Sequence, residues 1–447
     1  MRHEAVSVEH RLARYYRRSM HTSSIVHRRA RLANGLEIQA EVDSLAHTTA
    51  IGFFVKTGAR DEPIQLMGVS HFLEHMMFKG SSRRDALQVN RDFDELGASH
   101  NAFTTSELTA YYAHVLPERM HATLEILADL LRPSLRVADF DEEKGVILEE
   151  IAMYSDQPSW VGYESMMEHL YLGHPLAHRV LGTTASVTDL TRDQMASYFE
   201  SRYTPDNAVL VAAGNIDFDA LVAQATELCG PWTPTQPTRA HPSWMPVAAD
   251  VQLKLKNTAR AYLMLAMAAP SVQDPRRYAM SVLMHILGGG DGSRLHWALV
   301  ETGIAEEASS TYDGHDGLGD STIFAVCDPE KVDEIEAILR SELAALLDSL
   351  TEDDLLRARS RIATGAAAAG ERPNGRMFRL GTLWCYGSEY LTLEAEVEQI
   401  SAVTLADMRA CCESFPLLPT VRVVVLPEDE AADDAADASE DEVESLG

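Results

Sequence analysis

Alternating and continuous apolar runs predict mixed strands and helices in the first half of the chain. Residues 32–43 place a turn at Asn34–Gly35 before an alternating strand, and residues 48–63 give a buried strand and then a loop. Residues 66–78 are apolar on nearly every face, which is typical of a buried helix. The remaining elements expected here are a strand pair around residues 98–115, helices to about residue 201 and a strand over 207–216.

The second half repeats the same order of elements. A shift of 210 residues lays 259–270 over 49–60 and 281–290 over 71–80, with His285 on His75 and Gly290 on Gly80. Such self-similarity indicates an internal duplication. The sequence therefore predicts an α+β protein of two homologous domains, each a mainly antiparallel sheet with helices packed on one face.

Prolines and charges mark the boundaries of these domains. Five prolines within residues 230–246 exclude regular structure and indicate a linker. Residues 1–31 carry eight arginines against two glutamates, whereas residues 427–447 carry ten acids and no base. The expected parts are a basic irregular arm (1–30), a first domain (31–230), a proline-rich linker (231–246), a second, homologous domain (247–427) and an acidic disordered tail (428–447).

Composition removes several classes of function. A net charge of −30 argues against nucleic acid as a partner, because binding phosphates requires a basic surface. No apolar run approaches the length of a membrane span. Five cysteines without CxxC spacing favour neither a disulfide framework nor a cysteine–zinc site. These features lead us to expect a cytoplasmic protein.

The segment His71-Phe-Leu-Glu74-His75 carries the candidate chemistry. Its two histidines are spaced i and i+4, so they share one helix face, with Glu74 beside them. Two neutral imidazoles at this spacing suit zinc, and the adjacent carboxylate suits a general base. The order H-x-x-E-H is that of the inverzincins. The alternative is a histidine pair satisfied by core hydrogen bonds, which is costly on so apolar a helix.

A catalytic zinc needs a third protein ligand, and residues 139–154 offer one. Glu143 and Glu150 fall on one apolar helix stripe, whereas Glu142 and Glu149 point elsewhere. A solvated acidic helix is the competing interpretation, and periodicity alone favours neither.

Together these motifs resemble those of the pitrilysin family of zinc peptidases. The resemblance rests on HFLEH followed after 74 residues by Glu150, on the flanking stretches NAFTTSELTAYY and EEKGVILEEI, and on the two-domain layout over residues 30–427. The chain is most similar to the branch with two-domain subunits that includes mitochondrial processing peptidase and its bacterial relatives.

This resemblance implies roles for individual residues. It makes His71, His75 and Glu150 the ligands of a Zn²⁺ cofactor. Glu74 would then be the base that activates a zinc-bound water, and Glu143 would orient a ligand. By the same resemblance, Asn101 and Ala102 lie on an edge strand that holds an extended substrate through main-chain pairing. Without the family, Asn101 is equally well explained as a turn residue.

The second domain departs from the family pattern. Active relatives carry an arginine and a tyrosine after an SRL motif, and these bind substrate and stabilise the developing oxyanion. Here the motif is kept at residues 293–295, but Val300 and Glu306 occupy the expected arginine and tyrosine positions. His285 also lacks partners, since Ser281 and Met284 replace a histidine and a glutamate.

Two functional hypotheses of different classes follow. The first is a zinc-dependent endopeptidase that cleaves unfolded or extended peptides within a clamshell dimer, either a homodimer or a heterodimer whose related subunit supplies the Arg/Tyr pair. The second is a non-catalytic assembly or chaperone-like subunit, which the missing pair favours and the intact base at Glu74 opposes. A zinc hydrolase on an unrelated fold fits the layout less well.

Overall fold

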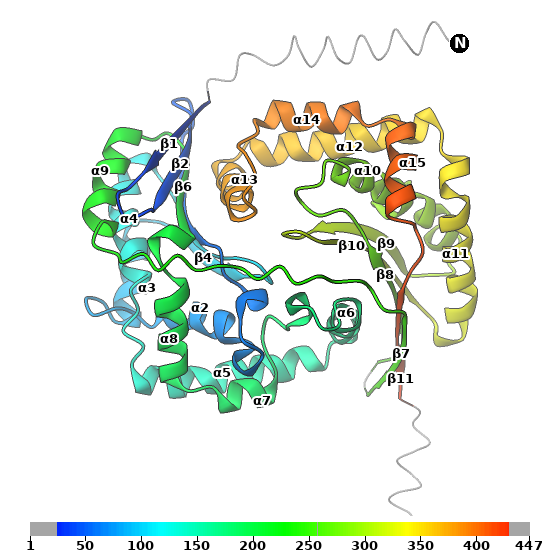
Figure 1. Ribbon diagram of the computed structural model, residues 1–447, viewed down its shortest axis with the longest axis horizontal. Coiled ribbons are helices and arrows are strands. Elements are labelled where there is room, and N and C mark those ends of the chain that lie inside the picture. Colours follow the sequence, from blue (N-terminus) through cyan, green and yellow to red (C-terminus); the bar gives the residue numbers. More distant parts are fainter. Residues whose placement is uncertain (1–24, 257, 429–447) are drawn as a thin grey trace, which may run out of the picture.

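The computed structural model describes residues 25–256 and 258–428, which fold into two halves that each contain one mixed sheet (Figure 1). The six-stranded first sheet has the order β1-β2-β6-β3-β5-β4, and the five-stranded second sheet has the order β7-β11-β8-β10-β9. The strands are β1 (Val26–Arg31), β2 (Glu37–Val42), β3 (Thr49–Val55), β4 (Ser99–Thr104), β5 (Thr109–Val115), β6 (Ala208–Gly214), β7 (Ala249–Leu255), β8 (Ala261–Ala268), β9 (Glu307–Gly314), β10 (Gly319–Cys327) and β11 (Val421–Pro427).

The helices divide between the same two halves. The first half contains α2 (Val69–Phe78), α3 (Ala86–Glu95), α4 (Met120–Leu130), α5 (Val137–Ser155), α6 (Pro158–Leu170), α7 (Thr184–Asp189), α8 (Arg192–Arg202) and α9 (Phe218–Cys229). The second contains α10 (Arg277–Gly288), α11 (Val332–Ser349), α12 (Glu352–Gly370), α13 (Pro373–Cys385), α14 (Leu393–Ala402) and α15 (Leu405–Ser414). No helix of the described residues is both long and apolar enough to cross a bilayer.

Apart from the additional edge strand β1, the first sheet has the same topology as the second, which confirms the predicted α+β pair of related halves. In each sheet one pair of strands is parallel, β2 with β6 and β7 with β11, and the other pairs are antiparallel. The strand next to the parallel pair in each sheet is β3 or β8. Along the chain, β3 leads to the apolar helix α2 and β8 to the apolar helix α10. Gly80 and Gly290, which the 210-residue shift superimposes, both have positive φ, at 101° and 109°.

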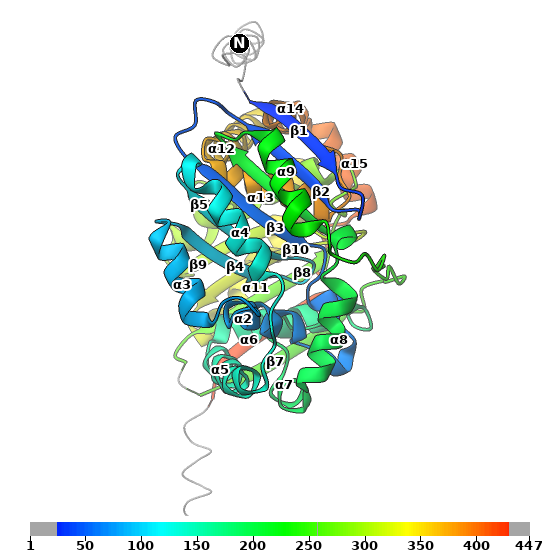
Figure 2. The ribbon, with the colours of Figure 1, turned by 90° about the vertical axis from the view of Figure 1, so that its left-hand side faces the viewer.

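Helices cover both faces of each sheet, whereas the sequence predicted helices on one face. The helix on the second face comes from the other half of the chain. In the first half α2, α4 and α9 pack on the face of β3 that carries Ile51 and Phe53, the side toward the viewer in Figure 2. The opposite face, with Ala50 and Phe54, packs against Met377 and other residues of α13 from the second half. Helix α6 of the first half packs reciprocally on β8 and β11. The two halves therefore complete each other's cores.

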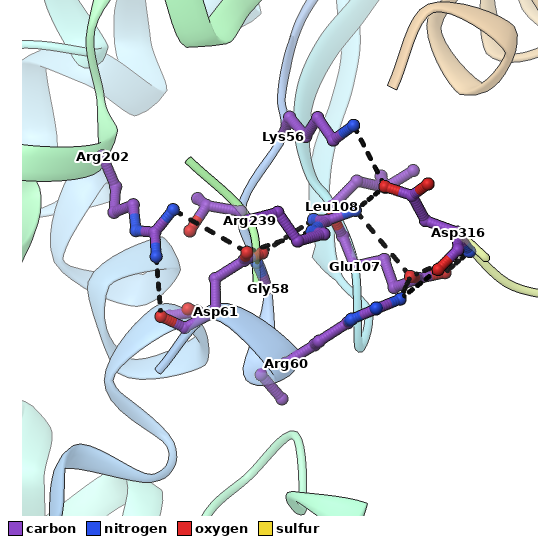
Figure 3. Close-up of polar contacts among 12 residues, drawn as sticks. Lys56, Gly58, Arg60, Asp61, Glu107, Leu108, Arg202, Arg239 and Asp316 are labelled. Atoms are coloured by element: carbon purple, nitrogen blue, oxygen red, sulfur yellow. Dashed lines mark hydrogen bonds and ion pairs between the residues drawn. The ribbon is translucent and has the colours of Figure 1, made fainter. Parts of the chain in front are cut away.

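A cluster of buried charges also joins the halves (Figure 3). Arg60 pairs with Glu107 at 2.6 Å and donates to the Asp316 main-chain oxygen at 2.7 Å. Arg239, from the linker, pairs with Asp61 at 2.7 Å and with Asp316 at 3.3 Å. Because these residues come from a loop after β3, the β4–β5 turn, the linker and the β9–β10 turn, the cluster fixes the linker between the halves.

The predicted segment boundaries can be compared with these elements. Residues 231–246 contain no helix or strand, as the prolines predicted. The expectation of an irregular arm through residue 30 is wrong for its last part, because Val26–Arg31 forms β1 and pairs with β2 along its length. Residues 1–24 and the acidic segment 429–447 lie outside the described residues. All five cysteines are buried and free.

Candidate metal centre

His71, His75 and Glu150 meet between helices α2 and α5. The Nε2 atoms of His71 and His75 lie 3.8 and 3.7 Å from the same Glu150 oxygen, Oε2. Among the described residues, these three form the one group of His, Cys, Asp or Glu side chains whose ligand atoms all lie within 4.8 Å of each other. The side chains of His71, His75 and Glu150 are 13%, 26% and 25% exposed, so the group is reachable from solvent.

Local sequence explains why α2 presents these histidines. Val69, Phe72 and Met76 are buried, and a helix that buries them turns the i and i+4 histidines together toward α5. Gly68 precedes the helix with φ 93°, and a Cβ there would stand 2.6 Å from the Leu181 main-chain oxygen. Only glycine therefore allows this close start of the helix.

The packing of α5 against α2 brings in the third side chain. The rings of Phe72 and Phe140 stack with centroids 4.8 Å apart. Glu143 and Ile147 are buried on the same face, and Glu149 is exposed, as predicted. Val146, which lies between Glu143 and Ile147 in the helix, is 44% exposed.

Glu143 supports the cluster from behind. Its Oε1 lies 2.9 Å from Nδ1 of His75, and its other oxygen pairs with Lys79. A carboxylate on Nδ1 fixes the tautomer and directs Nε2 toward a metal. Lys79 was not singled out from the sequence, although its position four residues after His75 on the same helix face was a signal for it.

Glu74 is held by the strand that follows. Thr104, the last residue of β4, donates its hydroxyl to Glu74 Oε2 at 2.6 Å. Sequence reasoning missed Thr104, which lies within the quoted NAFTTSELTAYY stretch. Burial raises the pKa of Glu74 more than this hydrogen bond and the charge of His75 lower it, and a raised pKa suits a carboxylate that accepts protons near neutral pH.

Burial also sets the protonation of the three candidate ligands. It lowers the pKa of His71 to about 3, with a smaller contribution from the charge of His75, so this imidazole is neutral. For His75, burial lowers the pKa, but the hydrogen bond and charge of Glu143 and the charges of Glu150 and Glu74 outweigh it and raise the pKa. Burial raises the pKa of Glu150.

This donor set fits a zinc ion. Zinc prefers imidazole nitrogens and carboxylate oxygens in a tetrahedral arrangement, and bonds of ~2.1 Å place such donors ~3.4 Å apart. The two measured nitrogen–oxygen separations of 3.8 and 3.7 Å are close to that value. Three protein ligands also leave a fourth position open, as in catalytic zinc sites.

Asn101 and Ala102 lie on β4, at the edge of the first sheet, as predicted. Asn101 is exposed and Ala102 is buried. The Asn101 side chain accepts a hydrogen bond from the Ala102 amide at 2.9 Å. Strand β4 thus lies beside the three candidate ligands, because Thr104 at its end hydrogen-bonds to Glu74.

Comparison with known proteins decides the family. Residues 38–184 match the family described as Insulinase (Peptidase family M16), and residues 189–362 match the one described as Peptidase M16 inactive domain. The chain belongs to the M16 family of zinc peptidases. The resemblance to pitrilysin-type enzymes is thereby confirmed.

Individual M16 relatives agree with this assignment. An uncharacterized zinc protease of Streptomyces coelicolor is 34% identical over 394 residues, which cover 86% of each chain. One of Mycobacterium tuberculosis is 32% identical over 406 residues, 87% of this chain and 90% of that one. Among solved structures, a protease from Helicobacter pylori has a TM-score of 0.85 at 17% identity, over 91% of this chain and 100% of that chain. A putative M16-like peptidase from Alicyclobacillus acidocaldarius has a TM-score of 0.80 at 23% identity, over 90% and 99%.

The second half of this M16 chain lacks the arginine and tyrosine that the resemblance implies. Val300 ends a short π-helical segment, His296–Val300, and Glu306 pairs with Arg260 at 2.5 Å. Arg294, from the retained SRL motif, pairs with Asp354 at 2.9 Å. Glu306 therefore has a local electrostatic role.

Proposed function

We propose that this M16-family chain is a zinc-dependent endopeptidase that cleaves unfolded or extended peptides. The observation that carries the proposal is the convergence of His71, His75 and Glu150, with Glu74 beside them. A purely structural metal site gains nothing from a carboxylate held in place next to it, and this argues against the non-catalytic alternative.

The residues of this centre would have separate roles. His71, His75 and Glu150 would hold zinc, which as a Lewis acid polarises water and the peptide carbonyl. Glu143 fixes the tautomer of His75. Because Thr104 donates to Glu74 Oε2, Oε1 is the oxygen that accepts a proton from the attacking water and later donates it to the departing amine.

The substrate would pair with the edge strand β4. An edge strand offers main-chain donors and acceptors to an added peptide strand, and β4 ends at Thr104, next to the base. Extended or unfolded peptides are therefore the substrate class that this geometry favours. Asn101 and Ala102 are the residues on this strand expected to contact the substrate.

We further propose that the active form is a clamshell dimer with a related subunit. Val300 and Glu306 stand where an arginine and a tyrosine are expected, and Glu306 is engaged with Arg260. A partner that carries the Arg/Tyr pair would stabilise the developing oxyanion. Within this proposal, a heterodimer fits better than a homodimer, because a second copy of this chain would bring the same substitutions.

The deciding experiment compares zinc-loaded wild type with Glu74→Gln and Glu149→Gln on a panel of quenched peptides. Glu149 is an exposed glutamate next to Glu150, so its variant is a matched control for loss of one carboxylate. We expect Glu74→Gln to abolish cleavage while zinc content stays near one per chain, and Glu149→Gln to cleave as wild type.

The outcomes separate the hypotheses. Cleavage that survives Glu74→Gln would refute the assigned base. Bound zinc without cleavage by wild type would require co-expression with a related M16 subunit, and cleavage that appears only then would assign the heterodimer. Absence of bound zinc would refute the proposal.

A further inference from the structure

A cavity of about 780 Å³ opens in the second half, away from the metal cluster. Five of the residues that line it are His285 of α10, Arg294 and Trp297 from the segment after α10, and Arg357 and Arg361 of α12. Trp297 is 59% exposed, which is unusual for so large an apolar side chain.

This cavity is the counterpart of the metal cluster in the duplicated half. Helix α10 corresponds to α2, and His285 takes the place of His75. Ser281 and Met284 stand where α2 carries His71 and Glu74. One imidazole therefore remains of the three ionisable groups on the helix.

Helix α12, which packs on α10, also lacks the metal-site residues of its counterpart α5. Helices α5 and α12 each contain 19 residues and pack on α2 and α10, respectively. Counted from the first residue of each helix, Ala358 and Gly365 stand at the positions of Glu143 and Glu150. Arg361 lies between them, where α5 carries an uncharged valine. The two glutamates that suit a cation are thus absent from the corresponding positions of α12, and three arginines line the cavity.

The charges in the cavity are unbalanced in favour of the positive sign. Arg294 and Arg357 share one carboxylate, that of Asp354, at 2.9 and 2.5 Å. Arg361 donates to the main-chain oxygen of Asp291, whose own carboxylate is 94% exposed. Asp291 also lines the cavity, so three guanidinium groups face two carboxylates, of which only that of Asp354 is largely buried. Guanidinium groups bind carboxylates through paired hydrogen bonds.

We propose that this cavity binds the carboxylates of an acidic peptide segment, with Arg357 and Arg361 as the main contacts and the ring of Trp297 against the peptide's apolar atoms. The occupant that charge complementarity favours is residues 428–447 of the chain itself, which carry ten acids and no base and follow β11 in the same half. A separate acidic peptide is the alternative outcome of the test. The proposal does not depend on the peptidase activity, because binding requires no zinc and no cleavage.

The test measures binding of a fluorescent peptide of ten glutamates to the full-length, zinc-free chain by anisotropy at low salt. We expect saturable binding that an uncharged peptide of ten glutamines does not reproduce. The double variant R357Q/R361Q should raise Kd about tenfold per lost charged contact. The control is R409Q, since Arg409 is also exposed and also donates to a main-chain oxygen, that of Leu347. R409Q should bind as wild type.

Two further variants keep the proposal decidable. W297F should leave binding in place but remove the change in tryptophan fluorescence that the peptide causes. Equal Kd values for wild type and R357Q/R361Q, with both folded by circular dichroism, would overturn the proposal. A full-length variant with the ten acids of residues 428–447 changed to Asn and Gln assigns the source. Tighter binding of the added peptide that R357Q/R361Q abolishes is expected if the chain's own segment occupies the cavity. Unchanged binding would assign the cavity to a separate acidic peptide instead.

Discussion

Replacing Arg239 with methionine tests whether the buried charge cluster holds the two halves together. The Arg239 side chain is 3% exposed and binds both oxygens of Asp61, at 3.0 and 2.7 Å, besides Asp316 at 3.3 Å. Methionine keeps much of the side-chain stem but removes the charge. Asp61, whose side chain is fully buried, would keep a distant Arg202 at 3.8 Å and the Gly58 amide at 3.1 Å.

The expected loss follows from the uncompensated charge. Removing one partner of a buried ion pair costs about 3–5 kcal/mol. Unfolding entropies of ~2.1 cal/mol/K per residue over about 400 residues convert this cost to a Tm about 4–6 °C lower, if both halves unfold together. Differential scanning calorimetry measures the change, and two resolved transitions in the variant would indicate that the halves have uncoupled.

The control and a double variant show whether the reasoning is right. Arg340→Met removes an exposed pair with Glu336, and such surface pairs contribute about 0–1 kcal/mol. The double variant Arg239→Met/Asp61→Asn should regain part of the lost stability, because no unpaired charge remains buried. A Tm for Arg239→Met within about 1 °C of wild type would refute the assigned role of the cluster, because at least 3 kcal/mol is expected from a buried pair.

Three other expectations follow from single contacts. Burial lowers the pKa of His315, but its hydrogen bonds to Asp320 and Glu107 raise it to about 10. The stability that it contributes is therefore complete below about pH 6.5, the unperturbed value, and is lost as pH rises toward 10; a Tm–pH profile measures this, and His315→Gln should flatten it. Gly381→Ala should destabilise the protein by about 1–3 kcal/mol, because the new Cβ would lie 2.4 Å from the ring of Phe54 in β3. Gly365→Ala meets no atom within 4 Å and should stabilise α12 by about 0.5–1 kcal/mol. Urea midpoints of the two variants test this contrast. Thr104→Val should lower kcat about tenfold through loss of the hydrogen bond to Glu74, with KM and zinc content unchanged and Thr104→Ser restoring kcat.

Much of the candidate centre could be predicted, because the helix face on which each side chain lies follows from local sequence periodicity. The spacing of His71 and His75 places both on one face of any helix that forms there, and the apolar residues around them ensure that it forms and is buried. The same periodicity put Glu143 and Glu150 on a shared face of α5. Periodicity could not decide whether these glutamates belong to a solvated acidic helix or include a metal ligand. The packing of α5 on α2 decided it, by bringing Glu150 within 4 Å of both imidazoles.

Other features arise from contacts distant in sequence, which a local pattern cannot encode. The pairing of Thr104 with Glu74 depends on where β4 ends relative to α2. The exchange of α6 and α13 between the halves depends on which helix reaches the uncovered face of each sheet. The sequence of neither helix specifies which sheet it covers.

The sequence by itself therefore determined local elements, the linker and the helix faces that carry the candidate ligands, because each depends on residues a few positions apart. It also showed the duplication, because the same order of elements recurs 210 residues later. The tertiary structure decided which faces meet. It brought Glu150 of α5 to the two histidines of α2, buried the Arg239–Asp61 pair between the halves, and gathered arginines around the second half's counterpart of the metal site. Those outcomes depend on the relative positions of whole sheets and helices, which a one-dimensional pattern does not contain.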